Sequence, residues 1–307
     1  MKYYIGIDIS KEKMDVASQD LGSSKVYSND TKGVKQLFKD LKEHPVHLVC
    51  EATGGYESLL IEQAFAHNLL ISRVNPRQVR DFSRAKGYLA KTDKIDAEMI
   101  CQFGQLFKPD AMKPLSETEK SLSAAVRYRS KLIKQQTRET IVLKTERNSF
   151  VRKELKASLV SLARRIERCE SEIYRLVASD EEKKKKCARL EEVKGIGKLT
   201  SAIVIAEFPE LGTLDDKSVA SLVGVAPMNR DSGKCRGKRK IQGGRGNIRK
   251  SLYMPAMSAR RFNPVFKEFY DRLIERGKCH LVAITAVIRK LICLLNRMLK
   301  DPDFCLS

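Results

Sequence analysis

The sequence predicts an N-terminal α/β module, a central pair of long helices in a coiled coil and a mainly helical C-terminal module. Before residue 110, short runs rich in β-branched and aromatic residues alternate with segments of helical periodicity. Neither proline nor glycine occurs from Leu115 to Lys194, so helices in that stretch can be long. A glycine-rich, basic segment then interrupts further helical patterns. These changes place the domains at 1–116, 117–189 and 190–307.

The first module has a definite order of elements. Tyr3–Ile9 is predicted as a strand from its β-branched and aromatic residues, and Gly33–Glu43 as a helix from its apolar spacing. The full prediction is strands at Tyr3–Ile9, Lys13–Ser18 and Lys25–Asn29, a helix at Gly33–Glu43, a strand at Val46–Cys50, a helix at Glu57–His67, a strand at Leu69–Val74 and a helix at about Lys94–Phe107. Three strands, a helix, a strand, a helix, a strand and a final helix is the element order of the ribonuclease-H-like fold.

Four carboxylates occupy informative positions in this module. Asp8 lies on the first strand, on the face opposite Ile5 and Ile7, and Glu51 ends a second strand. Asp93 and Asp96 are three residues apart and share one face of a helix. If they converge, a hard divalent cation such as Mg²⁺ would relieve their repulsion and could serve phosphoryl transfer. Singly, each acid is more often a helix cap or a solvated charge.

The central region carries a heptad seam. Seven apolar residues recur at intervals of four and three, with charges between them: Leu155, Leu159, Leu162, Ile166, Cys169, Ile173 and Leu176. We favour a coiled coil that dimerises the protein. The alternative is a helical hairpin within one chain, packed through the same seam.

Charge is distributed unevenly along the chain. The net charge is +21, yet residues 1–119 hold 17 basic and 17 acidic side chains. The remainder holds 42 of the 59 basic and 21 of the 38 acidic residues. A neutral N-terminal module that carries a chemical site, joined to a basic remainder that binds a polyanion, predicts a nucleic-acid partner.

The basic segment of residues 230–250 is the strongest predicted contact with phosphate. It holds nine Lys and Arg against one acidic residue and no aromatic residue, which suits backbone contact. The predicted contacts are Arg230, Lys234, Arg236, Lys238, Arg239, Lys240, Arg245, Arg249 and Lys250. A helix is expected after Gly246, capped by Asn247. The alternative is a disordered, solvated loop.

A second predicted phosphate contact precedes it. Val193–Ala202 is typical of a helix-hairpin-helix turn, in which Gly195 and Gly197 let backbone N–H groups approach a phosphate. Lys194 and Lys198 flank the two glycines. An ordinary tight connection between helices is the alternative.

Three motifs, GIDIS, CEATGGYE and KTDKIDA, resemble those of the DEDD transposases of the insertion sequence 110 family. These are mobile-element recombinases with a domain similar to the junction resolvase RuvC. The resemblance implies that Asp8, Glu51, Asp93 and Asp96 bind Mg²⁺. It extends over nearly the whole chain.

The resemblance also assigns Ser232 as the nucleophile, with Gly224 and Pro227 in the preceding motif. From the residues alone, Ser232-Gly233 is a turn dipeptide without a nearby histidine base. The implied mechanism is attack on DNA to form a phosphoserine link, which the freed 3′-hydroxyl of another strand then resolves without ATP. The implied partners are donor and target DNA, a bridge RNA and further copies of the chain, between which the site is assembled.

Other classes remain as alternatives. One is a junction nuclease that uses water, and another a non-catalytic scaffold that binds nucleic acid. An actin-like kinase shares the GIDIS-type strand, but a convincing second phosphate loop is lacking. The eight scattered cysteines and four histidines give a zinc site little support. His280–Leu299 is interrupted by charges, so we expect a buried helix, no membrane association and a cytoplasmic protein.

Overall fold

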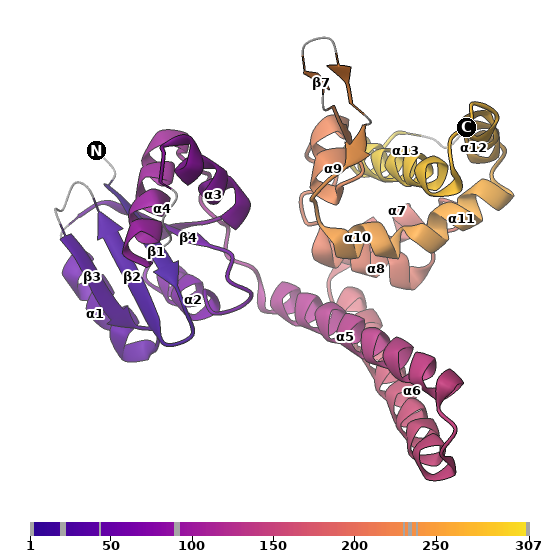
Figure 1. Cartoon of the computed structure of the whole chain (residues 1–307), viewed down its shortest axis with the longest axis horizontal. Coiled ribbons are helices and arrows are strands. Elements are labelled where there is room, and N and C mark those ends of the chain that lie inside the picture. Colours follow the sequence, from indigo (N-terminus) through magenta and orange to yellow (C-terminus); the bar gives the residue numbers. More distant parts are fainter. Residues whose placement is uncertain are drawn as a thin grey trace. The chain divides into compact units, whose positions relative to one another are not determined.

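The computed structural model describes residues 3–18, 23–42, 44–88, 93–229, 231–232, 235–237 and 239–304 (Figure 1). The chain forms two compact units, Met1–Pro114 and Leu115–Ser307. The first predicted boundary therefore falls two residues earlier than expected.

The first unit is built on a five-stranded mixed sheet in the order β3-β2-β1-β4-β5. Its strands are β1 (Tyr3–Ile9), β2 (Lys13–Ser18), β3 (Ser23–Ser28), β4 (Val46–Glu51) and β5 (Leu70–Val74). Strands β1, β4 and β5 run parallel, whereas β2 pairs antiparallel with β1 and β3. This arrangement is consistent with the predicted ribonuclease-H-like fold.

Helices cover both faces of this sheet (Figure 1). The odd-numbered isoleucines of β1 pack against α1 (Thr31–Leu41) and α2 (Ser58–Ala66). On the other face, Val49 of β4 packs in one cluster with residues of α3 (Pro76–Ala85) and α4 (Asp93–Phe107). The alternation of strand side chains thus places the buried isoleucines of β1 on one face of the sheet and Asp8 on the other.

The differences from the sequence prediction that bear on the site concern the helices α1 and α3. Helix α1 begins at Thr31 and not at Gly33, because the Asp30 carboxylate caps it by accepting from Gly33 N–H at 2.8 Å. Helix α3 was not predicted at all. Its start carries a recognisable signal, since Asn75 caps it by accepting from the backbone N–H of Arg77 and Pro76 occupies its first turn.

The second unit begins with two long antiparallel helices. Its helices are α5 (Glu117–Thr145), α6 (Ser149–Ala178), α7 (Glu181–Glu191), α8 (Lys198–Glu207), α9 (Asp216–Val223), α10 (Gly246–Ser251), α11 (Tyr253–Phe262), α12 (Pro264–Glu275) and α13 (His280–Lys300). A capping box of Ser116 and Glu119 starts α5, and the Asn148 side chain caps α6 after a three-residue turn.

Most of the heptad seam packs within the chain. Leu162 and Ile166 of α6 bury against Leu132 of α5, while Ile173 and Leu176 join a larger cluster with other α5 residues. This is the intramolecular hairpin that the sequence left as the alternative, so these positions are not available for a dimer seam. The same large cluster includes residues of α8 and α13, so one core spans the predicted boundary at residue 190.

No helix in the described part of the chain combines the length and the apolar character that crossing a membrane would require.

Candidate active site

Three of the four predicted metal ligands line one pocket of about 360 Å³ in the first unit. Asp8 comes from β1, Glu51 from the end of β4 and Asp96 from the first turn of α4. Asp8 and Asp96 lie more than 80 positions apart in the sequence, so the fold brings them together. We call this the carboxylate pocket.

Strand direction explains the position of Asp8 and Glu51. Parallel strands β1 and β4 are in register up to Ile7 and Cys50, and each carboxylate follows one of these residues. Carboxyl ends of parallel strands open into a common crevice in α/β folds, which is where ligands bind. Both acids therefore reach the same edge of the sheet.

Gly6 explains how helix α4 reaches that edge. A Cβ atom on Gly6 would lie 2.2 Å from both the Ala97 carbonyl oxygen and the Cys101 nitrogen. Only glycine permits the backbone of β1 and the helix to approach so closely. This contact seats the first turn of α4, which holds Asp96, beside the strand that holds Asp8.

Asp93 is the first residue of α4, and its side chain lies outside the described part of the structure. Among the described residues, no group of three or more His, Cys, Asp or Glu side chains stands close enough to hold a metal. The donor set nevertheless suits Mg²⁺, because the pocket offers carboxylate oxygens and neither thiol nor imidazole. The predicted ligands would be Asp8, Glu51, Asp93 and Asp96.

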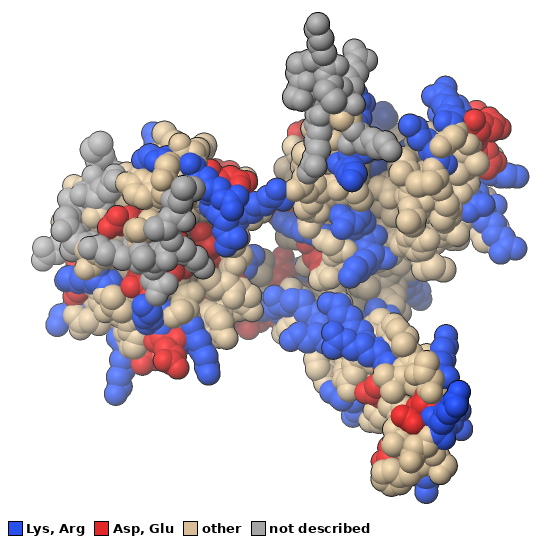
Figure 2. Space-filling view, in the orientation of Figure 1, with Lys and Arg blue, Asp and Glu red and all other residues tan. Residues whose placement is uncertain are grey.

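Helix α3 adds cations that the sequence prediction missed. Arg80, Ser83 and Arg84 lie at helical spacing on one face of α3 and line the carboxylate pocket. Residues 76–88 hold four basic side chains and one acidic side chain within an otherwise neutral unit. Figure 2 shows Lys and Arg gathered over this helix. The pocket therefore pairs carboxylates with guanidinium groups, an arrangement suited to a metal ion and a phosphate together.

Glu57 holds the turn that follows Glu51. Its buried carboxylate accepts hydrogen bonds from Gly55 N–H at 2.8 Å and the Thr53 hydroxyl at 2.9 Å, and it pairs with Arg73 at 3.4 Å. Burial by itself would raise the pKa of Glu57, but these hydrogen bonds and the Arg73 charge outweigh it and lower the pKa. Glu57 thus positions the segment after Glu51, a predicted metal ligand, without lining the pocket.

We expect Glu57→Gln to destabilise the protein by about 1–3 kcal/mol at pH 7, because the amide would point N–H groups at Arg73 or at backbone donors. A lowered folded-state pKa contributes stability above the unfolded pKa of about 4.3 and loses it as the pH falls through the folded value. The difference between variant and wild type should therefore shrink below about pH 4. Urea unfolding followed by circular dichroism measures it. Glu62→Gln, an exposed change on α2, is the control, and an equal effect of both variants would contradict the assignment.

Ser232 lies on a small two-part β-ribbon in the second unit. In the pair nearer the turn, β7 (Asp231–Ser232) pairs with β8 (Cys235–Arg236), so that Ser232 is opposite Cys235. In the pair nearer the two ends of the ribbon, β6 (Pro227–Met228) pairs with β9 (Lys240–Ile241). We call residues 224–244 the serine ribbon. Its paired strands differ from the disordered loop that was the alternative.

Backbone contact between glycines closes the foot of the serine ribbon. A Cβ atom on Gly244 would lie 2.2 Å from Gly224 N, and one on Gly224 would lie 2.1 Å from Gly243 O. Gly224 also has φ +74° and ends helix α9. The guanidinium of Arg249 donates to the carbonyl oxygens of Gly224 at 2.9 Å and Gly243 at 3.2 Å. These contacts fasten both ends of the ribbon to the same place.

Two of the side chains predicted to contact phosphate bind other groups of the protein. Arg249 fastens the ribbon, as described, and Arg245 forms a two-pronged ion pair with Glu210 at 2.8 and 2.6 Å. Arg245 also precedes α10 at its N-cap position. The predicted cap, Asn247, instead lies inside α10 and donates to Glu207 at 3.4 Å, so that prediction was wrong by two residues.

The other predicted contacts are partly described. Arg239, Lys240 and Lys250 are exposed. Arg230, Lys234 and Lys238 lie outside the described residues, as do the side chains of Ser232 and Arg236.

The predicted helix-hairpin-helix turn connects α7 and α8. Gly195 has φ +103°, which favours glycine, and Gly197 is the N-cap residue of α8 without a capping side chain. Ile196 is buried beneath the turn, while Lys194 and Lys198 are exposed. The geometry is compatible with phosphate contact and equally with a plain connection.

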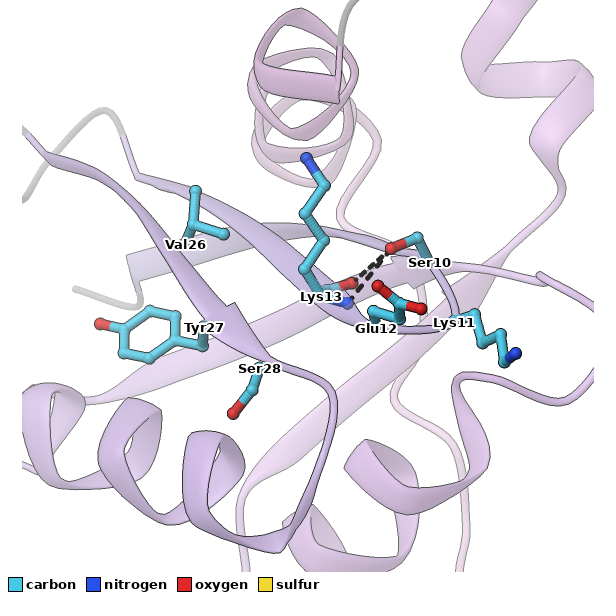
Figure 3. Close-up of a pocket in the computed structure, with 7 residues that line it drawn as sticks. All are labelled: Ser10, Lys11, Glu12, Lys13, Val26, Tyr27 and Ser28. Carbon is cyan, nitrogen blue, oxygen red and sulfur yellow. Dashed lines mark hydrogen bonds between the residues drawn. The ribbon is translucent and has the colours of Figure 1, made fainter.

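A larger hollow of about 550 Å³ lies beside the turn between β1 and β2 (Figure 3). Ser10 and Lys13 close this turn through hydrogen bonds of 3.0 and 3.2 Å. The lining side chains in Figure 3 point in different directions and do not converge. None of the predicted site residues that the structure describes lines this hollow, so the carboxylate pocket is the better candidate.

Comparison with known proteins gives matches along most of the chain. A model described as a transposase matches residues 5–145, and a model of the transposase IS116/IS110/IS902 family matches residues 187–271. Pilin gene-inverting proteins of Moraxella bovis and Moraxella lacunata are each 28% identical, with 95% of this chain and 94% of theirs aligned. An uncharacterized 43.6 kDa protein of insertion element IS110 from Streptomyces coelicolor is 29% identical over 36% of this chain and 28% of its own length.

Proposed function

This chain belongs to the IS110 family of transposases, which are DNA-rearranging enzymes, and from that premise we propose how it cuts and rejoins DNA. Ser232 is the nucleophile, and the carboxylate pocket holds the phosphate that it attacks. The observation that carries the proposal is the meeting of Asp8, Glu51 and Asp96 in one pocket from distant parts of the sequence.

The carboxylates and the arginines of the pocket have separate tasks in this proposal. Asp8, Glu51, Asp93 and Asp96 would bind Mg²⁺, which neutralises charge on the phosphate when it is bound. Arg80 and Arg84 line the same pocket from α3 and would hold the neighbouring DNA phosphates. Arginine suits this task because its planar fork matches two phosphate oxygens.

The chemical step transfers one phosphodiester bond to the protein and back. The Ser232 oxygen forms a bond to phosphorus and loses its proton, while the bond from phosphorus to the 3′-oxygen breaks and that oxygen takes up a proton. A 3′-hydroxyl of a different strand then attacks the phosphoserine and releases Ser232. Each step exchanges one phosphate ester for another, so no ATP is required.

Two further parts of the proposal concern partners. The Moraxella relatives are named for inverting a pilin gene, and we propose that this chain likewise joins two DNA sites. A bridge RNA that pairs with both sites would select them. Because Ser232 and the carboxylate pocket lie in different units, we propose that copies of the chain cooperate, as a homodimer or larger assembly.

Recombination of a donor and a target plasmid by the purified protein tests the proposal. We expect product only when Mg²⁺ and the non-coding RNA of the element are both present. Product without RNA would remove the guided part of the proposal. Folded protein that binds both plasmids yet yields no product under any of these conditions would favour the scaffold alternative.

A further inference from the structure

We propose that an exposed row of basic side chains on helix α5 binds the phosphodiester backbone of a nucleic-acid duplex. The row consists of Arg127, Lys131, Lys134 and Arg138, and we call it the α5 basic stripe. Their intervals of four, three and four residues place them on one face of the helix, and all four are exposed. This inference rests on the proposed function in one respect, which is that the ligand is a nucleic acid.

The stripe lies in a stretch without acidic residues. Residues 120–138 contain six Lys and Arg and no Asp or Glu. Elsewhere in the second unit, basic residues are commonly paired, as Arg129 is with Glu170 at 2.6 Å and Arg175 with Glu172 at 2.7 Å. Within the described residues, no member of the stripe forms an ion pair.

Such an arrangement is costly unless an anion is nearby. Like charges one turn apart on a helix destabilise it by a few tenths of a kcal/mol per pair. An acidic residue at one of the intervening positions would relieve this repulsion, as happens along α7, where Lys184 pairs with Glu181 and Lys186 with Glu182. The α5 basic stripe therefore has the composition of a surface that meets an external polyanion.

The stripe begins beside the foot of the serine ribbon. Burial raises the pKa of Glu207 at the end of α8, and the charges of Arg127 and Arg245 act on the same carboxyl group. Glu207 also accepts a hydrogen bond from Asn247 of α10. Arg127 thus lies near the segment that follows the ribbon, and Figure 2 shows blue side chains over the first part of α5 and over α10.

The dimensions of the stripe suit a duplex. Arg127 and Arg138 are eleven positions apart, which is about 16 Å along the helix at 1.5 Å per residue. Double-stranded DNA carries one negative charge per about 1.7 Å of its axis, so about ten phosphates of its two strands lie along this length, enough for each of the four side chains to meet one. A row of charges at regular helical spacing favours contact with the phosphate backbone over reading of the bases.

Fluorescence anisotropy with a labelled random-sequence duplex tests this inference. The variant carries Arg127→Gln, Lys131→Gln, Lys134→Gln and Arg138→Gln, and affinity is measured against salt concentration in EDTA. Four lost phosphate contacts should reduce the salt slope by about 3.6 and weaken binding about tenfold or more at 0.1 M salt. Parallel titrations with DNA and RNA duplexes identify which nucleic acid lies on the stripe, and a loss with either supports the inference.

A matched control removes the same charge from the other helix of the hairpin. Lys153→Gln, Lys156→Gln, Arg164→Gln and Arg168→Gln change four exposed residues of α6, where Glu154 and Glu167 interrupt the basic face. An unchanged slope in the α5 variant, or an equal loss in the α6 variant, would overturn the inference.

If the fourfold α5 variant proves unfolded by circular dichroism, single variants at Lys131 and Lys134 should each lower the slope by about one. Because EDTA prevents metal-dependent chemistry, failed recombination with intact duplex binding would count against the proposed function alone.

Discussion

Ser232→Ala is expected to abolish both strand transfer and a covalent link between protein and DNA, while DNA binding stays intact. The hydroxyl is the only group removed, and alanine has no atom that can form the phosphate ester. Loss of a serine nucleophile costs about 10⁶-fold in rate in enzymes where it has been measured. The link is detected as a labelled DNA strand that remains with the protein after denaturation.

Ser221→Ala is the matched control for this prediction, because Ser221 is an exposed serine on α9 of the same unit. It should leave the covalent link unchanged. Two results would contradict the role of Ser232. A link that persists in Ser232→Ala would mean another nucleophile, and cleavage without any link would mean that water attacks, as in the junction-nuclease alternative.

Asp8→Asn is expected to lower DNA cleavage by more than about 100-fold and to weaken binding of Mg²⁺ or Mn²⁺. Loss of a residue that merely supports a metal ligand costs about 10–100-fold, so loss of a ligand should cost more. Asparagine has the same shape and keeps one oxygen, and we expect the fold to be retained. Calorimetry with Mn²⁺ measures metal binding, and cleavage against Mg²⁺ concentration measures its consequence.

Two comparison variants make this test specific. Asp81→Asn changes an exposed carboxylate of α3 that does not line the carboxylate pocket, so metal binding should be unaffected. The double variant Arg80→Gln and Arg84→Gln should keep metal affinity and lose affinity for DNA, because these side chains are proposed to hold phosphate. Equal metal binding by Asp8→Asn and wild type would refute the metal site.

Sequence patterns predicted the first unit well because its elements depend on local periodicity. The five strands and three of the four helices were predicted within two residues at most ends. Helix α3 was missed because only Val79 is fully buried, so its apolar pattern is weak. The pair Asn75-Pro76 is a helix-start signal that predicts α3. That prediction would also have placed Arg80 and Arg84 on one helix face.

The sequence did not predict which groups the charged residues of the basic segment and the apolar residues of the heptad seam would contact. Arg245 and Arg249 stand in a basic run like their neighbours, and only the folded chain brings Glu210 and the Gly224 carbonyl within their reach. The heptad seam equally suits a partner chain or a neighbouring helix of the same chain. A three-residue turn after α5 makes the neighbouring helix the nearer partner, and contacts within one chain require no association.

The sequence by itself determined the five strands of the first unit and three of its four helices, and which part of the chain is neutral and which is basic. These properties follow from spacing and composition along the chain. Only the tertiary structure decided that Asp8, Glu51 and Asp96 share a pocket with Arg80 and Arg84, and that Gly6 admits α4 to that edge of the sheet. Contacts between residues far apart in sequence depend on packing of whole elements, and no local pattern encodes which surfaces will meet.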